Sequence, residues 1–127
     1  MQNQKSAIGL DANITALIGY PIGILALVLI FIEKENKFVR FHAIQSVLWS
    51  VALTVLIILI AIVGTVIGLV AASMSETLAW AVGAVIVLIY FGAFIGLFAG
   101  IIYGAVKAYG GSMAKLPFVG GFAEKWS

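Results

Sequence analysis

The chain has 127 residues, of which 64% are hydrophobic and 9% are charged, and its formal net charge is +2. A soluble domain is about a quarter charged, so this composition excludes a free-standing soluble domain and a disordered tail and indicates an integral membrane protein. The small net charge excludes a nucleic-acid binder with a basic face, and the lack of cysteine excludes disulfides and thiolate metal sites.

Three runs of the sequence carry no charged residue. They contain 21, 35 and 30 residues and lie at 12–32, 41–75 and 77–106. A helix needs about 20 apolar residues to cross the hydrocarbon core of a bilayer. The sequence therefore predicts an all-α, three-span transmembrane helix bundle forming a single membrane domain over residues 1–127. Its spans are expected at about 14–32, 46–72 and 78–105.

The first expected span contains Pro21, which should kink the helix, and a short charged connection at 33–37 follows it. A positively charged loop after such a long apolar run is not typical of a cleavable signal peptide, so we expect the span to remain as an anchor. In the connection before the third span, Ser73 and Glu76 fit a capping box that would open that helix.

The distribution of Lys and Arg predicts an orientation. In a three-span protein the first loop and the C-terminal tail lie on one side, and together they hold six of the seven basic residues. Basic residues collect in cytoplasmic loops. We therefore expect a multi-pass membrane protein with its N-terminus outside and its C-terminus in the cytoplasm.

Glycines recur at helical spacing in the expected spans. The third span has one every four residues, at Gly92, Gly96, Gly100 and Gly104, and the second has Gly64 and Gly68. Small residues four apart let helix backbones approach closely in a membrane. This glycine zipper predicts helix packing, and three alternatives stay open: packing inside the bundle, a seam between copies of the chain, or a face lining a pore.

The segment 38–46, FVRFHAIQS, is the least generic part of the chain. On a helix, His42 and Gln45 share one stripe, whereas Arg40 lies on the other side, where it could reach the headgroups. The two polar side chains would face protein or a wet crevice at the membrane edge, where they would either bond a neighbouring loop or perform chemistry, and the first alternative is favoured. A metal site is not expected because no second histidine, cysteine or nearby carboxylate accompanies His42.

This segment, with the preceding EKENK and the tail motif LPFVG at 116–120, resembles small bacterial and archaeal membrane proteins of unknown function. That family is distantly similar to the Tic-twenty subunit of the chloroplast inner-envelope import translocon. The resemblance implies a protein of a prokaryotic cell membrane that acts as a scaffold or accessory subunit of a membrane complex. It marks Arg40, Phe41, His42 and Gln45 as family-motif residues and candidate partner contacts.

The C-terminal tail, residues 107–127, interleaves apolar and charged side chains. This pattern is typical of a segment lying at the headgroup level, with aromatic rings in the interface and lysines toward anionic lipid. Lys115, Phe122 and Trp126 are the expected interfacial anchors. A role in docking a partner is the alternative.

The chain offers no arrangement for catalysis. No charged residue falls within an expected span, and the only histidine lies at the membrane edge. We therefore expect no catalytic, cofactor-binding or metal-binding residue. The function predicted is that of a non-enzymatic membrane protein, a scaffold or accessory subunit, whose partners are the lipid bilayer and other membrane proteins or further copies of itself. The alternative is a homo-oligomeric channel or protein-translocation component.

Overall fold

The computed structural model describes residues 4–127, which form five helices and no strand within that range. The chain divides into two compact units. Unit 1 combines the N-terminal part up to Val51 with Phe98–Ser127, and unit 2 is Ala52–Leu97. The two longest helices contribute residues to both units.

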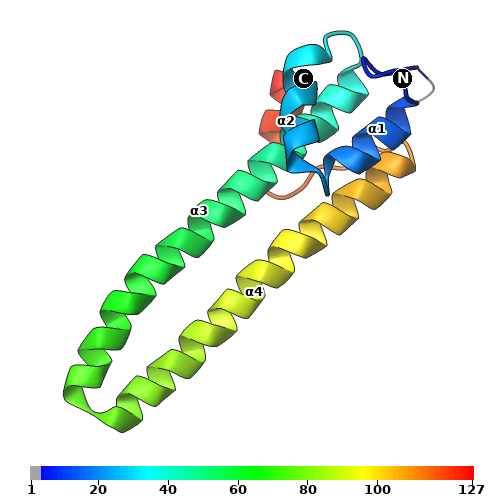
Figure 1. Cartoon of the computed structure of the whole chain (residues 1–127). Coiled ribbons are helices and arrows are strands. Elements are labelled where there is room, and N and C mark those ends of the chain that lie inside the picture. Colours follow the sequence, from blue (N-terminus) through cyan, green and yellow to red (C-terminus); the bar gives the residue numbers. More distant parts are fainter. Residues whose placement is uncertain (1–3) are drawn as a thin grey trace. The chain divides into compact units, whose positions relative to one another are not determined.

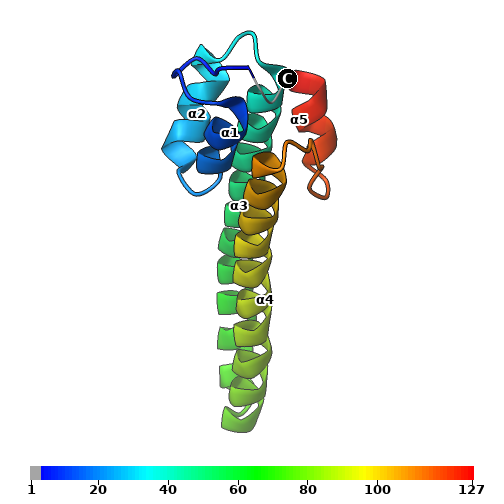
Figure 2. The same cartoon turned by 90° about the vertical axis from the view of Figure 1, so that its right-hand side faces the viewer.

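Unit 1 holds three short helices and one end of each long helix. Its helices are α1 (Ala12–Gly19), α2 (Gly23–Ile32), α5 (Gly120–Trp126) and the adjoining parts of α3 (Lys37–Met74) and α4 (Glu76–Tyr109). Figures 1 and 2 show α1 and α2 joined by a short turn, with the start of α1 and the end of α2 at the same end of the unit. The core is built from alanine, larger aliphatic and aromatic side chains, among them Ala12, Ala16, Tyr20, Ala26, Leu29, Phe38, Val39 and Ala108.

Unit 2 is formed by α3 and α4, which are joined by a tight turn at Ser75 (Figure 1). The hydroxyl of Ser75 accepts a hydrogen bond from the Leu78 N–H at 3.0 Å, so Ser75 caps α4. The capping box expected from Ser73 is therefore wrong. Ser73 still belongs to α3, where its hydroxyl donates to the Val70 carbonyl.

Two helices, not three, are long and apolar enough to cross a membrane in the described part of the chain. They are α3, with 38 residues, and α4, with 34, and they contain the second and third expected spans. The first expected span is corrected: α1 ends at Gly19 and α2 begins at Gly23. Pro21 lies between them, and because proline lacks an N–H and restricts the preceding residue, it breaks the helix where a kink was expected.

The correction also changes the expected orientation. A chain that crosses a membrane twice has both ends on one side, so the expected pair of an outside N-terminus and a cytoplasmic C-terminus requires a third span. The segment that would supply it consists of helices of only 8 and 10 residues. Those lengths are well below the roughly 20 residues that a crossing requires.

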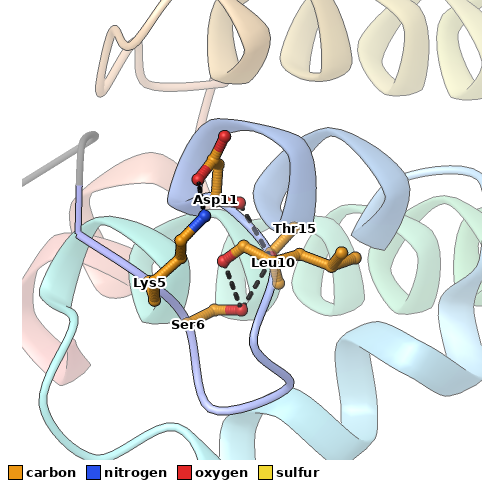
Figure 3. A network of polar contacts seen from close by, with 5 residues as sticks. All are labelled: Lys5, Ser6, Leu10, Asp11 and Thr15. Carbon is orange, nitrogen blue, oxygen red and sulfur yellow. Dashed lines mark hydrogen bonds and ion pairs between the residues drawn. The ribbon is translucent and has the colours of Figure 1, made fainter.

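The segment before α1 is held by a local polar network (Figure 3). Lys5 forms an ion pair with Asp11. The hydroxyl of Ser6 lies 3.1 Å from the Leu10 carbonyl and 2.7 Å from the Thr15 hydroxyl, which itself donates to the Asp11 carbonyl. These contacts fold residues 5–11 back over the first turn of α1.

Candidate functional site

A buried polar cluster lies in unit 1, where α3 meets the break between α1 and α2. Nδ1 of His42 lies 2.7 Å from the Tyr20 hydroxyl, and the Gln45 amide donates to the same hydroxyl at 2.8 Å. All three side chains are essentially inaccessible to solvent. Tyr20 precedes Pro21, so the helix break places its ring against α3.

The second side of the cluster is the loop that follows α4. Nε2 of His42 lies 2.8 Å from the Ser112 carbonyl, and Gln45 bonds the backbone at both of its amide atoms. Its nitrogen donates to the Ala114 carbonyl, and its oxygen accepts from the Leu116 N–H. His42 and Gln45 therefore bond a neighbouring loop, which is one of the two alternatives left open by the sequence.

The bond partners define the direction of every hydrogen bond in this cluster. A carbonyl only accepts, so Nε2 of His42 carries the proton and Nδ1 accepts from the Tyr20 hydroxyl. The Tyr20 oxygen in turn accepts from Gln45. Burial raises the pKa of the Tyr20 hydroxyl above its ordinary value of 10.0, while the bond from Gln45 acts in the opposite direction. Tyr20 is thus a neutral donor at ordinary pH.

Aromatic rings close around the His42 imidazole. The rings of Tyr20, Phe38 and Phe41 each meet it edge-on, with centroids 5.5, 4.8 and 5.0 Å away. Phe41 is fully buried and also packs against Ile44 and Ala123. Hydrogen bonds and aromatic rings thus surround the His42 imidazole.

Arg40 binds the end of α2 instead of extending toward headgroups. Its Nη1 donates to the carbonyls of Ile30 at 2.7 Å and Glu33 at 2.8 Å. Its Nη2 lies 3.4 Å from the Trp126 carbonyl at the end of α5. The last carbonyls of a helix lack intrahelical hydrogen-bond donors. The Arg40 guanidinium supplies such donors at the end of α2. The expected snorkelling of Arg40 is therefore corrected, because nearer carbonyls take its donors.

Two residues of the charged connection have structural roles that the sequence reading missed. The Asn36 side chain accepts hydrogen bonds from the N–H groups of Phe38 and Val39 and so caps α3. Glu33 is buried and accepts from the N–H groups of Asn36 and Ala7. Asparagine immediately before a helix is a recognised capping signal, so the role of Asn36 was readable. The bond to Ala7, 26 residues away, was not.

The zipper glycines fall into two groups. Gly100 and Gly104, in unit 1, lie directly under the rings of Trp49 and Tyr20, where a Cβ atom would overlap the ring atoms. These two positions need the absence of a side chain. Gly104 in particular lets the Tyr20 ring approach α4 closely.

The other zipper positions, in unit 2, are less crowded. A Cβ at Gly64 would meet Ile86 at 3.3 Å, and one at Gly96 would meet Leu53 at 4.0 Å. Gly68 and Gly92 have nothing within 4 Å of that position. Of the zipper glycines, only Gly100 and Gly104 therefore pack against aromatic rings.

The expected interfacial anchors lie on and beside α5. Phe122 and Trp126 are each about half exposed, and their ring centroids are 5.4 Å apart. Lys115 forms an ion pair with Glu124 across the same segment. Phe118, before α5, is 94% exposed and has a positive φ of 67°. The tail therefore presents aromatic rings outward, next to charged side chains.

Within residues 4–127 no cluster of three or more His, Cys, Asp or Glu side chains is placed to hold a metal ion. Every buried side-chain nitrogen or oxygen in that range has a hydrogen-bond partner. The polar atoms of the cluster around His42 are thus bonded to one another and to the neighbouring backbone.

The chain was compared with known proteins. A curated relative, the UPF0132 membrane protein of the archaeon Methanocaldococcus jannaschii, is 47% identical over 45 residues. That match covers 35% of this chain and 41% of the relative, so it spans about two fifths of the relative's length. No solved structure matches the chain.

A protein-family comparison covers far more of the sequence. Residues 3–123 match the model of a family that is described as the magnetosome magnetite crystal formation protein family. Both this match and the archaeal relative agree with a small membrane protein. The chain belongs to the magnetosome magnetite crystal formation protein family.

Proposed function

We propose that this chain is a non-enzymatic integral membrane protein that serves as a scaffold or accessory subunit of a membrane complex. The observation that carries the proposal is the exposed apolar surface of α3 and α4. Only 6% and 11% of their most apolar windows are buried within the chain. An exposed apolar surface of that extent needs lipid or protein around it. The polar groups around His42, by contrast, bond one another, which leaves the helices as the surface for partners.

The family description suggests the kind of process in which such a subunit takes part. In a host that forms magnetite, we propose that the chain organises the membrane around the crystal and does not bind the mineral itself. Iron at a mineral surface is bound by oxygen ligands such as carboxylates, and the chain has only five. Three of these are engaged: Asp11 and Glu124 in ion pairs, and Glu33 with backbone N–H groups.

We further propose that α3 and α4 cross the membrane as a hairpin with both chain ends in the cytoplasm. All seven Lys and Arg residues lie before Phe41 or after Val106, and the turn around Ser75 has none. The basic-residue rule therefore favours this two-span topology more strongly, seven to none, than it favoured the three-span one. A cysteine at the exposed Met74 should react with an impermeant reagent only from outside. Labelling only from the cytoplasmic side would contradict the topology.

A homo-oligomeric channel or translocation component is the second candidate, in line with the Tic-twenty resemblance. The open positions Gly68 and Gly92 favour it, because small residues without a neighbour let another helix approach closely. A passage of this kind needs several copies around an axis, whereas an accessory subunit joins larger partners.

Gentle extraction of the tagged full-length chain from its native membranes separates the two candidates. The scaffold role predicts larger membrane proteins co-purifying at a ratio that stays fixed in two different detergents. A homo-oligomer without other subunits would favour the channel. In that case Gly92→Leu should weaken the contact between copies and reduce the mass of the oligomer. The role in the mineral process is tested by expressing this chain in a magnetite-forming strain that lacks its own family member. Expression should restore the size of the crystals, as measured by electron microscopy. Unchanged crystals at normal protein level would reject that part of the proposal.

A further inference from the structure

We propose that α1 and α2 form a re-entrant helical hairpin, which enters one leaflet from the side of the chain ends, turns at Pro21 and faces lipid acyl chains with one stripe of α2. The hairpin does not cross the membrane. It is a third membrane-contacting element beside α3 and α4, whichever complex the chain serves.

The lengths of the two helices exclude a crossing by either one. α1 has 8 residues and α2 has 10, which at 1.5 Å per residue gives about 12 Å and about 15 Å. The hydrocarbon core is about 30 Å thick. Each arm therefore reaches about halfway at most, although the segment from Ala12 to Ile32 carries no charge.

Polar contacts join the two ends of the hairpin to each other. Oε2 of Glu33, which follows α2, accepts a hydrogen bond from the Ala7 N–H at 2.6 Å. Lys5 and Asp11 form their ion pair immediately before α1. The charged residues thus gather at the open end, where α1 begins and α2 ends, as expected if that end lies among headgroups and water.

Part of the backbone at the turn of the hairpin is hydrogen-bonded within the chain. The Gly19 carbonyl accepts from the Ser46 hydroxyl at 3.1 Å, and the Ile22 N–H donates to the Ile18 carbonyl. The Tyr20 hydroxyl bonds within the polar cluster on α3. Non-helical backbone at membrane depth is tolerated only where protein surrounds it. The cluster around His42 provides that environment for Gly19 and Tyr20, which are buried, whereas residues 21–24 are exposed.

One face of α2 is left without a neighbour in the chain. Ile24, Leu27, Val28 and Phe31 follow the helical spacing of three, four and seven, and Ile24 and Phe31 are 79% and 66% exposed. The opposite face, at Ala26 and Leu29, is buried.

Lipid is the occupant that the chemistry of this face favours. The stripe consists of hydrocarbon only, whereas protein interfaces carry about one hydrogen bond per 100–200 Å². Exposed Lys34 and Lys37, with the exposed Glu35 between them, follow its C-terminal end, where charged side chains can meet headgroups. Acyl chains along the stripe and headgroups at the lysines fit both features.

The natural lack of cysteine allows single-cysteine variants of the full chain in vesicles of anionic and zwitterionic lipid. Ala7→Cys and Lys34→Cys, both at exposed positions, should react with an impermeant maleimide from the same side. Reaction from opposite sides would mean that the segment crosses the membrane and would overturn the proposal.

Spin labels at Ile24→Cys and Phe31→Cys then identify what covers the stripe. Acyl chains predict frequent collisions with oxygen and rare collisions with a water-soluble nickel complex, with Lys34→Cys as the nickel-accessible control. Rare collisions with both agents would mean protein on the stripe, and frequent nickel collisions would mean water. Either result would overturn the proposal without affecting the scaffold role, which is tested by co-purification.

Discussion

The hydroxyl of Tyr20 lies 2.7 Å from Nδ1 of His42 and links the break between α1 and α2 to the first part of α3. The loop after α4 is reached through both partners of this hydroxyl, because His42 bonds the Ser112 carbonyl and Gln45 bonds the Ala114 carbonyl. One buried hydroxyl therefore joins three segments that are far apart in the sequence. The family-motif residues act as an internal support for this junction.

Tyr20→Phe should destabilise the protein while keeping its ring. The change removes the donor to His42 and the acceptor for Gln45 in a buried site. Leaving a buried polar group unsatisfied costs about 1–3 kcal/mol, so we expect a loss of that size in the free energy of unfolding in mild detergent. Tyr103→Phe, at an exposed position, is the matched control and should have little effect. Equal effects of the two changes would contradict the role assigned to the Tyr20 hydroxyl.

The raised pKa of Tyr20 predicts a loss of stability in alkali. Its hydroxyl keeps its proton in the folded state above pH 10, whereas the unfolded chain releases it near the ordinary value of 10.0. Unfolding then releases a proton, so this group lowers the free energy of unfolding by up to about 1.4 kcal/mol per pH unit above that value and has no pH effect well below it. Stability measured from pH 8 to 11 should fall more steeply for the natural chain than for Tyr20→Phe. Parallel curves would contradict the shift.

Alanine substitutions should divide the zipper glycines by unit. At Gly100 and Gly104 a Cβ would overlap the rings of Trp49 and Tyr20, and overpacking of this kind costs about 1–3 kcal/mol. At Gly92 a Cβ meets nothing within 4 Å, so Gly92→Ala should be neutral or add up to about 1 kcal/mol through helix propensity. Thermal unfolding of the three variants in one detergent measures the difference. Equal losses at all three positions would mean that Gly92 also packs against a neighbour, such as a second copy.

The long helices α3 and α4 were predictable because each contains a long apolar run without charged residues. The first span was predicted wrongly from the same signal, because 21 uncharged residues fit a crossing helix and also fit two half-length ones. Tertiary contacts decide between the two alternatives. Helix α1 can end before Pro21 because the Ser46 hydroxyl donates a hydrogen bond to the Gly19 carbonyl.

The candidate site was predictable in part for a related reason. Helical spacing correctly placed His42 and Gln45 on one stripe, since that depends only on local geometry. Their partners at 20 and 112–116 could not be found, because sequence spacing carries no signal for contacts 22 to 71 residues apart. Arg40 shows the same limit: its face was predicted, but its carbonyl partners on α2 were not.

Arg40→Lys should loosen the end of α2. The guanidinium bonds the carbonyls of Ile30 and Glu33 together, whereas an ammonium is a compact charge without the planar fork that reaches both. We expect a loss of about 1–2 kcal/mol and faster amide hydrogen exchange over the last turn of α2. Lys37→Ala, three residues earlier and exposed, is the control and should leave exchange unchanged. Slow exchange retained in Arg40→Lys would mean that the carbonyls are satisfied without this side chain.

Trp126 should report the depth of the C-terminal tail in the membrane. With Trp49 and Trp80 replaced by Phe, its fluorescence is the only tryptophan signal, since the chain has three. The half-exposed rings of Trp126 and Phe122 suit the interfacial region, where tryptophan is enriched. Lipids brominated near the headgroup should therefore quench it more strongly than lipids brominated near the chain end. Phe122→Ser should shift quenching toward aqueous iodide, because it removes the neighbouring ring at 5.4 Å that shares the apolar surface. Strong iodide quenching before that change, without any effect of bromine, would show that the tail lies in water and that its aromatic rings are free for a protein partner.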